Sequence, residues 1–407
     1  MTTLPFLPYG RQVIDDDDIA AVVAALKSPF LTQGPLVDRF EAALAAAVGA
    51  RHAIACSNGT TALHLATAVL DLKPGDAVIV PAITFLATAN AARYVGAEVA
   101  FADVDPATGL MRVADAERAL LQARARGWRP AAVAPVHLAG QPADPVGFRE
   151  FAALHRLAVI EDACHAVGTR YRRPDGSEAR IGDGSSAALT AFSFHPVKTI
   201  ATGEGGAVTT GDDALAARLR RLRTHGMVRE PGQFRELDEA LAPEGGANPW
   251  YYEMAELGFN YRLTDLQCAL GLSQIAKLGR FVARRQELVA LYDRHLAPLA
   301  PVVRPLGRVA GSSPGWHLCV ALIDFAATGR SRAQVMNALR DQGIGTQVHY
   351  APVPHQPYYR DRYGAPDCPG AWAYYRHCLS LPLFPAMAHG DVARVVSALA
   401  AALGLPA

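Results

Sequence analysis

Short apolar runs alternate with helix-like segments between residues 51 and 210. The apolar runs are residues 52–56, 77–80, 98–101, 131–134, 157–160 and 189–192, and stretches such as 61–70 and 114–125 lie between them. This alternation is typical of the α/β class, in which helices cover a mostly parallel sheet. Ligands bind beyond the carboxyl ends of the strands in such sheets, so the residues after each run are the first candidates for function.

Length and composition narrow the class of protein further. The 407 residues are 51% hydrophobic, which allows a large core and more than one domain. A formal net charge of +1 gives no reason to expect a basic, nucleic-acid-binding face. No apolar run approaches the ~20 residues of a membrane span, and the first residues lack a secretory pattern. Six scattered cysteines without a CxxC pair indicate neither a metal site nor a disulfide framework, so we expect a cytoplasmic protein.

The remaining segments suggest how the chain is organised. Four aspartates at 15–18 precede an amphipathic stretch, and carboxylates at this position favour the start of a helix over residues 19–26. Residues 232–250 are rich in Pro, Gly, Asn and Glu and predict a long loop. A long helix is expected over about 265–296. We divide the chain into a large domain, residues 1–270, and a small α+β C-terminal domain, residues 271–407.

Two strand ends carry candidates for binding a flat, phosphorylated ligand. Gly59 follows the first run and allows a close backbone approach, and Thr60 and Thr61 then open a helix, whose free amides and dipole could hold a phosphate. Small polar residues are common at such junctions, so this signal alone is weak. Phe85 follows the second run and could stack on a ring, although it could equally belong to the core.

Two further strand ends carry candidates for catalysis. Asp162 directly follows a buried run, where a carboxylate needs a partner such as a protonated ring nitrogen, and His165 could reach the same ligand. The alternative is a helix-capping aspartate beside a structural histidine. Lys198 lies in an apolar stretch bordered by glycines, where desolvation would make its amine a nucleophile towards an aldehyde. Most lysines are surface charges, so Lys198 alone would carry little weight.

Together these candidates form the set that pyridoxal phosphate requires. They supply a phosphate cradle, a stacking aromatic ring, an acid for the pyridine nitrogen and a lysine that forms a Schiff base. The acid keeps the pyridine nitrogen protonated, and the lysine can also shuttle a proton once it is released.

Motifs along nearly the whole chain support this interpretation. They are LTQGP (31–35), SNGT (57–60), PAITF (81–85), EDACHA (161–166), FSFHPVK (192–198), GEGG (203–206), THGM (224–227) and GFNYRL (258–263). With this set the chain resembles the DegT/DnrJ/StrS sugar aminotransferases, which have the aspartate aminotransferase-like type I fold of pyridoxal-phosphate enzymes.

The resemblance assigns a role to each candidate. It implies that Lys198 forms the Schiff base, that Asp162 pairs with the pyridine nitrogen and that Phe85 stacks on the ring. It places His165 near the ring hydroxyl. The phosphate ligands that it implies are Gly59, Thr60, Ser193 and, from the neighbouring subunit of a homodimer with shared sites, Asn260. It also implies glutamate as amino donor, with pyridoxamine phosphate formed in the first half-reaction.

A narrower similarity concerns the substrate. Segments PYGRQ (8–12), LTQGP (31–35), WHL (316–318) and QVHYAPVPHQPYY (347–359) are similar to those of pseudaminic-acid pathway transaminases. Those enzymes aminate C4 of a UDP-linked 4-keto-6-deoxy-N-acetyl-hexosamine to an L-altro product. The substrate-binding residues that we expect on this basis are Thr32, His195, His349 and Tyr350. The alternative for the last segment is a loop that Pro and Tyr merely make rigid.

Three other functions deserve comparison with this one. A sugar dehydratase on the same scaffold would have histidine in place of Lys198. A regulatory, non-catalytic protein could lose Lys198 or Asp162, yet both are present. A transaminase for another nucleotide-linked amino sugar would keep both residues and differ around residues 349–359.

Overall fold

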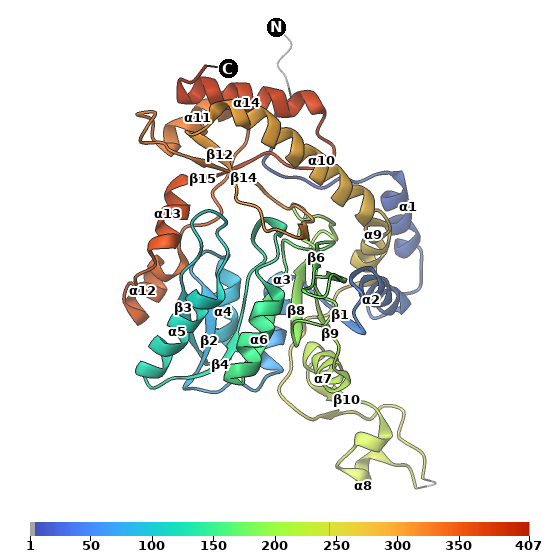
Figure 1. Ribbon diagram of the computed structural model, residues 1–407. Helices are drawn as coiled ribbons and strands as arrows, with labels where there is room; N and C mark the ends of the chain where they lie inside the picture. The colour runs from blue at the N-terminus through green and yellow to red at the C-terminus, as the bar shows by residue number, and fades with distance from the viewer. Residues whose placement is uncertain (1–4, 244, 407) are drawn as a thin grey trace.

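The computed structural model describes residues 5–243 and 245–406 and has a seven-stranded sheet at its centre (Figure 1). Its strands are β1 (His52–Cys56), β2 (Asp76–Pro81), β3 (Glu98–Ala102), β4 (Arg129–Val133), β5 (Ala158–Asp162), β8 (Leu189–Ser193) and β9 (Gly206–Thr210). The strand order is β1-β9-β8-β5-β4-β2-β3, and the five strands from β8 to β3 are mutually parallel. The α/β prediction and its six strands are therefore confirmed.

Strand β9 was not predicted, and it changes one edge of the sheet. It lies between β1 and β8 and is antiparallel to both. Its sequence, GAVTT, begins at the glycine-rich segment that we interpreted only as a border of Lys198. Glycine is needed there, because a Cβ on Gly206 would lie 2.3 Å from the Asn58 carbonyl oxygen. Glycine generally disfavours β-strands, but the close approach of the Asn58 backbone requires it at the start of β9.

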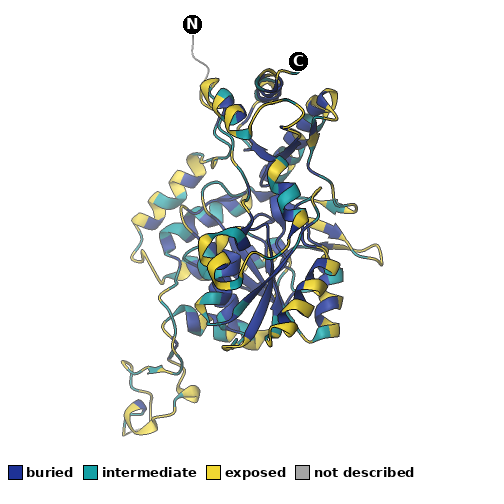
Figure 2. Cartoon of the chain, turned by 90° about the vertical axis from the view of Figure 1, so that its left-hand side faces the viewer, coloured by how far each residue is buried: buried dark blue, intermediate teal, exposed yellow. Residues whose placement is uncertain are grey.

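Helices cover both faces of the sheet. One face packs against α3 (Gly59–Ala68), α4 (Leu86–Tyr94) and α7 (Asp213–Arg223), and the other packs against α5 (Val113–Ala125), α6 (Pro145–His155) and α2 (Pro35–Val48). Successive residues of a strand point to opposite faces of the sheet. In β2, Val78 and Val80 pack on the side of α3 and α4, whereas Ala77 and Ile79 pack on the side of α5 and α6. Figure 2 shows the strands buried and the outer helix faces exposed.

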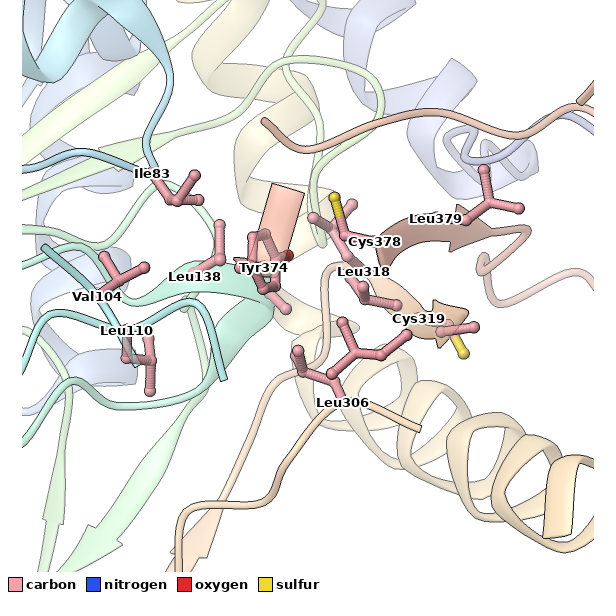
Figure 3. Close-up of a cluster of buried hydrophobic side chains, with 14 of the residues drawn as sticks. Ile83, Val104, Leu110, Leu138, Leu306, Leu318, Cys319, Tyr374, Cys378 and Leu379 are labelled. Carbon is pink, nitrogen blue, oxygen red and sulfur yellow. The ribbon is translucent and has the colours of Figure 1, made fainter. Parts of the chain in front are cut away.

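The C-terminal part of the chain forms a smaller antiparallel sheet with helices. The strands are β12 (Val303–Pro305), β14 (Cys319–Ile323) and β15 (Cys378–Leu381), and the helices are α11 (Arg332–Asp341), α12 (Pro357–Tyr363), α13 (Pro369–His377) and α14 (His389–Leu403). One hydrophobic cluster joins this sheet to the central one, with Tyr374 between Leu138 on one side and Leu318 on the other (Figure 3). The domain boundary near residue 270 stays a prediction.

The single helix predicted over 265–296 is wrong, because two helices meet at Lys277. They are α9 (Asp265–Ala276) and α10 (Leu278–Leu296). Helix α9 packs on α1 (Asp16–Leu26) and α2, whereas α10 packs on α14, and one straight helix could not serve both directions. No helix among the described residues is long and apolar enough to cross a bilayer.

The predicted loop at 232–250 belongs to an arm that projects from the body (Figures 1 and 2). The short strands β10 (Met227–Val228) and β11 (Glu253–Met254) pair at its base, and α8 (Leu237–Ala240) lies in its outer part. A third small sheet, of β6 (Arg170–Arg172), β7 (Glu178–Arg180) and β13 (Ser312–Ser313), lies beside the central one.

The helix predicted after the four aspartates is confirmed as α1. The aspartates that cap it also contact Lys277, the residue between α9 and α10. Asp15 and Asp18 form a reciprocal capping box. Asp18 is fully buried, accepts a hydrogen bond from Gln274 Nε2 at 2.8 Å and lies 2.9 Å from Lys277 Nζ. The aspartates therefore serve the fold, as expected, and attach the N-terminal helix to α9.

Replacing Asp18 by Ala should lower the free energy of unfolding by about 3 kcal/mol, because it removes the buried carboxylate that binds both the half-buried Lys277 and the buried Gln274, and leaves Lys277 with Asp15 alone of its two aspartates. Urea unfolding would measure the loss. Asp17→Ala is the matched control, since Asp17 is exposed in the same turn and should change stability by less than about 0.5 kcal/mol. Equal losses in both variants would contradict the buried role of Asp18.

Candidate active site

The carboxyl ends of the central strands surround a cavity of about 640 Å³. The predicted residues that line it are Gly59, Thr60, Phe85, Asp162, His165, Ser193, His195, Lys198, His349 and Tyr350. They come from segments up to about 290 positions apart in the chain, and the parallel sheet brings their strand ends together at one edge. Of the residues predicted to bind ligands, Thr32 and Asn260 lie outside this cavity.

One end of the cavity is built to hold an anion. Asn58 caps α3 by accepting a hydrogen bond from the Thr61 amide at 2.9 Å, and the amides of Gly59 and Thr60 in the first turn need partners outside the helix. A Cβ on Gly59 would lie 2.8 Å from the Cβ of Ser193, so only glycine allows strand β8 to approach this closely. Free amides, the helix dipole and the Ser193 hydroxyl together suit a phosphate group.

The cavity lining also includes a buried carboxylate. Asp162 ends β5 and is 4% exposed. Its Oδ1 accepts a hydrogen bond from the Cys164 amide at 3.1 Å, and its Oδ2 accepts one from the Thr88 hydroxyl at 2.6 Å. A carboxylate can accept about four hydrogen bonds, so lone pairs remain for a donor in the cavity. Phe85 caps α4 beside it and is 56% exposed, which leaves its ring available for stacking.

Lys198 supplies the amine of the cavity. The chain has only four lysines, of which Lys27 and Lys73 are exposed and Lys277 pairs with aspartates near α1. Burial lowers the pKa of Lys198, and the negative charge of Asp162 only partly opposes this shift. A lowered pKa increases the neutral, nucleophilic fraction of the amine.

The phosphate cradle, the carboxylate, the stacking ring and the amine line one cavity, and their chemistry fits pyridoxal phosphate. Gly59, Thr60 and Ser193 would hold its phosphate, Asp162 its ring nitrogen and Lys198 its aldehyde. The bound group would supply the electron sink that amino-group transfer requires.

A group of neutral histidines lies on the side of the cavity next to the C-terminal sheet. Burial lowers the pKa of His165 and of His317 well below the ordinary range, with the Lys198 charge as a second cause. Their rings lie 4.4 Å apart between centroids. The Ala139 amide donates to His165 Nδ1 at 3.3 Å, which places the ring proton on Nε2, 3.2 Å from the Tyr350 hydroxyl. His165 is thus oriented as a neutral donor towards Tyr350.

His349 and Tyr350 bring the predicted substrate segment to the same cavity. His349 Nδ1 lies 2.8 Å from the Ser380 hydroxyl, and its carbonyl accepts a hydrogen bond from the Tyr374 hydroxyl at 3.0 Å. The Tyr350 ring lies 6.1 Å from that of Phe85, across the cavity. Burial raises the pKa of Tyr350, so its hydroxyl stays protonated and can donate. The segment with His349 and Tyr350, held on the C-terminal sheet through Ser380, therefore forms one wall of the site.

Thr32 and Asn260 lie elsewhere in this chain. Thr32 pairs with Thr264 through a backbone bridge, and Asn260 pairs with Thr224 at the base of the arm. Both Thr32 and Asn260 are exposed. This position is compatible with the expectation that Asn260 acts in the site of a neighbouring subunit.

Several cavity residues were not among the predicted ligands. They are Tyr9, Asn58, Thr84, Cys164, Glu204, His317, Gln347 and Gln356. Asn58 could have been found as a capping residue from its position shortly before the expected helix. The role of His317 depends on its packing against His165, 152 positions away, which no local pattern reveals.

Comparison with known proteins identifies the family. A model described as the DegT/DnrJ/EryC1/StrS aminotransferase family matches residues 12–400. The chain belongs to this family. It is therefore a pyridoxal-phosphate-dependent sugar aminotransferase, and the predicted family, enzyme class, cofactor and aspartate aminotransferase-like fold are confirmed.

Individual relatives cover almost the whole chain. The spore coat polysaccharide biosynthesis protein SpsC of Bacillus subtilis is 39% identical, with 97% of this chain and 96% of that protein covered. The Helicobacter pylori aminotransferase PseC, involved in pseudaminic acid biosynthesis, has a TM-score of 0.86 at 26% identity, covering 98% and 99%. Spr1654 of Streptococcus pneumoniae, solved in a PLP form, has a TM-score of 0.82 at 25% identity, covering 99% of each chain.

The neutral histidines make stability depend on pH. Burial, with a smaller effect of Lys198, lowers the pKa of His349 to about 3. Between pH 3 and about 6.5 the unfolded chain binds a proton that the folded His349 does not, so stability falls as pH falls below about 6.5. We expect His349→Gln to reduce this slope by up to ~1.4 kcal/mol per pH unit.

Urea unfolding of the cofactor-free protein at a series of pH values would measure the slope. His295→Gln is the control, because His295 is exposed and far from the cavity. If His349→Gln and His295→Gln kept the same slope as the unmodified protein, the buried histidine would not be its source.

Proposed function

We propose that the enzyme transfers the amino group of glutamate to C4 of a UDP-linked 4-keto-6-deoxy-N-acetyl-hexosamine of L-arabino-hexulose type, in pseudaminic acid biosynthesis. The product would be the UDP-linked 4-amino-4,6-dideoxy-N-acetyl-β-L-altrosamine. The observation that carries the proposal is the meeting of Lys198, Asp162 and the α3 N-terminus with His349 and Tyr350 in one cavity. The likeness to PseC over 98% of the chain supports the choice of sugar. The six free cysteines suit a cytoplasmic reaction.

The similarity to SpsC favours a second candidate of the same chemistry. SpsC takes part in spore coat polysaccharide biosynthesis and is 39% identical to this chain. The alternative substrate would therefore be another nucleotide-linked keto-sugar, for a different surface polysaccharide. Both candidates use the same donor, cofactor and lysine.

The residues of this chain would divide the reaction between them. Lys198 would hold the cofactor and then carry a proton between the reacting carbon atoms, for which its lowered pKa suits it. Asp162 would keep the ring nitrogen protonated, and Phe85 would stack on the ring. His165 would lie beside the ring hydroxyl as a neutral donor.

His195, His349 and Tyr350 would bind the sugar nucleotide in the cavity, and Thr32, which lies outside the cavity of its own chain, would do so in the site of the partner subunit. His195 is exposed at the cavity and can contact a large substrate. The hydroxyl of Tyr350 and the ring nitrogens of His349 offer directional hydrogen bonds to sugar hydroxyls or a diphosphate.

A homodimer with shared sites would complete the phosphate cradle with Asn260 of the partner subunit. An apolar stripe on α1 supports a second copy as partner: Ile19, Val23 and Leu26 are 54%, 40% and 56% exposed. Such a row on one helix face marks an interaction surface. Trp250, Met254 and Leu257 at the base of the arm are also exposed.

The choice of sugar can be tested on the pyridoxamine-phosphate form of the enzyme. Each candidate UDP-4-keto-sugar is added and the return of the yellow form is followed, with the amino-sugar product identified by NMR. The proposal predicts that the L-arabino-hexulose substrate restores the yellow form fastest. Faster return with a different keto-sugar would favour the second candidate.

Two substitutions test the proposed roles of the cavity. Lys198→Ala should abolish turnover but keep some non-covalent cofactor binding, and Asp162→Asn should keep the fold while slowing turnover by more than about tenfold. Steady-state kinetics and cofactor absorbance would measure both effects. Lys73→Ala, at an exposed position, is the control. Full activity of either cavity variant would refute its assigned role.

Mixing two inactive variants tests the shared site. A dimer of one Lys198→Ala chain and one Asn260→Ala chain holds one site with both native residues, so random mixing should restore about a quarter of native activity. Activity of the mixture, compared with each variant alone, is the measurement. No recovery after verified subunit exchange would show that each site uses its own Asn260.

A further inference from the structure

Two buried threonine hydroxyls connect the start of α4 to the Asp162 carboxylate. Thr84 directly precedes the capping residue Phe85, and Thr88 lies in the first turn of the helix. Their side chains are buried, with exposures of 1% and 2%. The two hydroxyl oxygens lie 2.7 Å apart, and that of Thr88 lies 2.6 Å from Asp162 Oδ2. The three groups form a continuous chain that ends at the cavity.

The chemistry of these groups sets the direction of both hydrogen bonds. An ionised carboxylate only accepts, so Thr88 donates its single proton to Asp162. The carbonyl of Phe85, at 3.3 Å, is a more distant acceptor for that proton. Because the Thr88 proton is committed, its oxygen accepts and Thr84 donates. Both donors therefore point towards Asp162, and the bond to the charged acceptor is the stronger of the two.

The other carboxylate oxygen is held by a separate donor. Asp162 Oδ1 accepts the Cys164 amide at 3.1 Å. With a fixed donor on each oxygen, the carboxylate cannot rotate without losing a hydrogen bond. Its remaining lone pairs keep one direction towards the cavity, where a ring nitrogen would meet them.

We propose that Thr84 and Thr88 are positioning residues that aim the Asp162 carboxylate at the pyridine nitrogen of the cofactor. The inference rests on the proposed role of Asp162 and deepens it. Phe85 lies between the two threonines, so one short segment at the start of α4 carries both the stacking ring and the groups that orient the acid. Stacking and ring protonation are thereby set by the same rigid unit.

If these hydroxyls only stabilised the fold, removing them would have the same effect as removing any other buried hydroxyl. A buried threonine away from Asp162 therefore serves as the control. Thr67 is also buried on a neighbouring helix, with an exposure of 4%. Its hydroxyl lies 2.9 Å from the His64 carbonyl and 3.1 Å from the Ala91 carbonyl, and it contacts no cavity carboxylate. Thr67→Val therefore removes a buried hydroxyl that contacts α4 at Ala91 but neither Thr84, Thr88 nor Asp162.

The experiment compares Thr88→Val, Thr84→Val, Thr88→Ser and Thr67→Val as cofactor-loaded enzymes. The first readout is the ¹⁵N chemical shift of the ring nitrogen in labelled pyridoxal phosphate, which reports its protonation directly. The second is the single-turnover rate with glutamate. Thermal unfolding of the same samples identifies any variant that fails to fold.

We expect Thr88→Val to move the ¹⁵N shift towards that of the unprotonated ring and to slow the half-reaction about tenfold to a hundredfold. Thr84→Val should act in the same direction by a smaller factor. Thr88→Ser keeps the hydroxyl and should restore both readouts to within about threefold of native. Thr67→Val should leave the shift and the rate unchanged even if it lowers thermal stability.

A native ¹⁵N shift in folded Thr88→Val would overturn the proposal, as would equal effects of Thr88→Val and Thr67→Val. The shift requires neither donor nor sugar, so it decides the role of the threonines even if the proposed substrate is wrong. If Thr88→Val does not fold, Thr84→Val decides through the same shift, and a native shift in folded Thr84→Val would then overturn the proposal. A native shift in both Thr84→Val and Asp162→Asn would instead refute the role of Asp162 itself.

Discussion

A buried carboxylate without a cationic hydrogen-bond partner is the constraint around which this site is arranged. Asp162 is held by a hydroxyl and an amide, both of them neutral donors. A desolvated carboxylate with such partners is costly in free energy unless positive charge lies nearby. Lys198 lies in the same cavity, but burial favours its neutral form, so a protonated ring nitrogen would supply this charge. The site is therefore electrostatically prepared for a cationic ring before any ligand binds.

The sheet makes this arrangement possible because it gathers distant segments at one edge. Strand β5 delivers Asp162, the segments after β1 and β2 deliver the phosphate cradle and Phe85, and β8 ends at Ser193. The segment with His349 and Tyr350 closes the cavity, and hydrogen bonds of His349 to Ser380 and Tyr374 attach it to the C-terminal sheet and the shared hydrophobic cluster. A change in the packing between the two sheets would thus alter the substrate wall more than the cofactor wall.

Local sequence patterns predicted the parts of the molecule that local chemistry determines. Six strands, the helix after the aspartates and the residues at the strand ends follow from apolar runs and capping residues. Strand β9 was missed because close backbone approach requires glycine at its start. The break at Lys277 was missed because its cause, packing against α1 and α14, is tertiary. The same limit applies to the Thr84–Thr88 pair and to His317, whose partners lie more than 70 positions away.

The central claim is that Lys198 is the residue to which pyridoxal phosphate attaches. Treating the loaded enzyme with borohydride and mapping the labelled peptides by mass spectrometry tests it directly, because the chain offers only four lysines. The account predicts a phosphopyridoxyl group on Lys198 and none on Lys27, Lys73 or Lys277. Stoichiometric label on any of those three, or a loaded enzyme that carries no label, would contradict it.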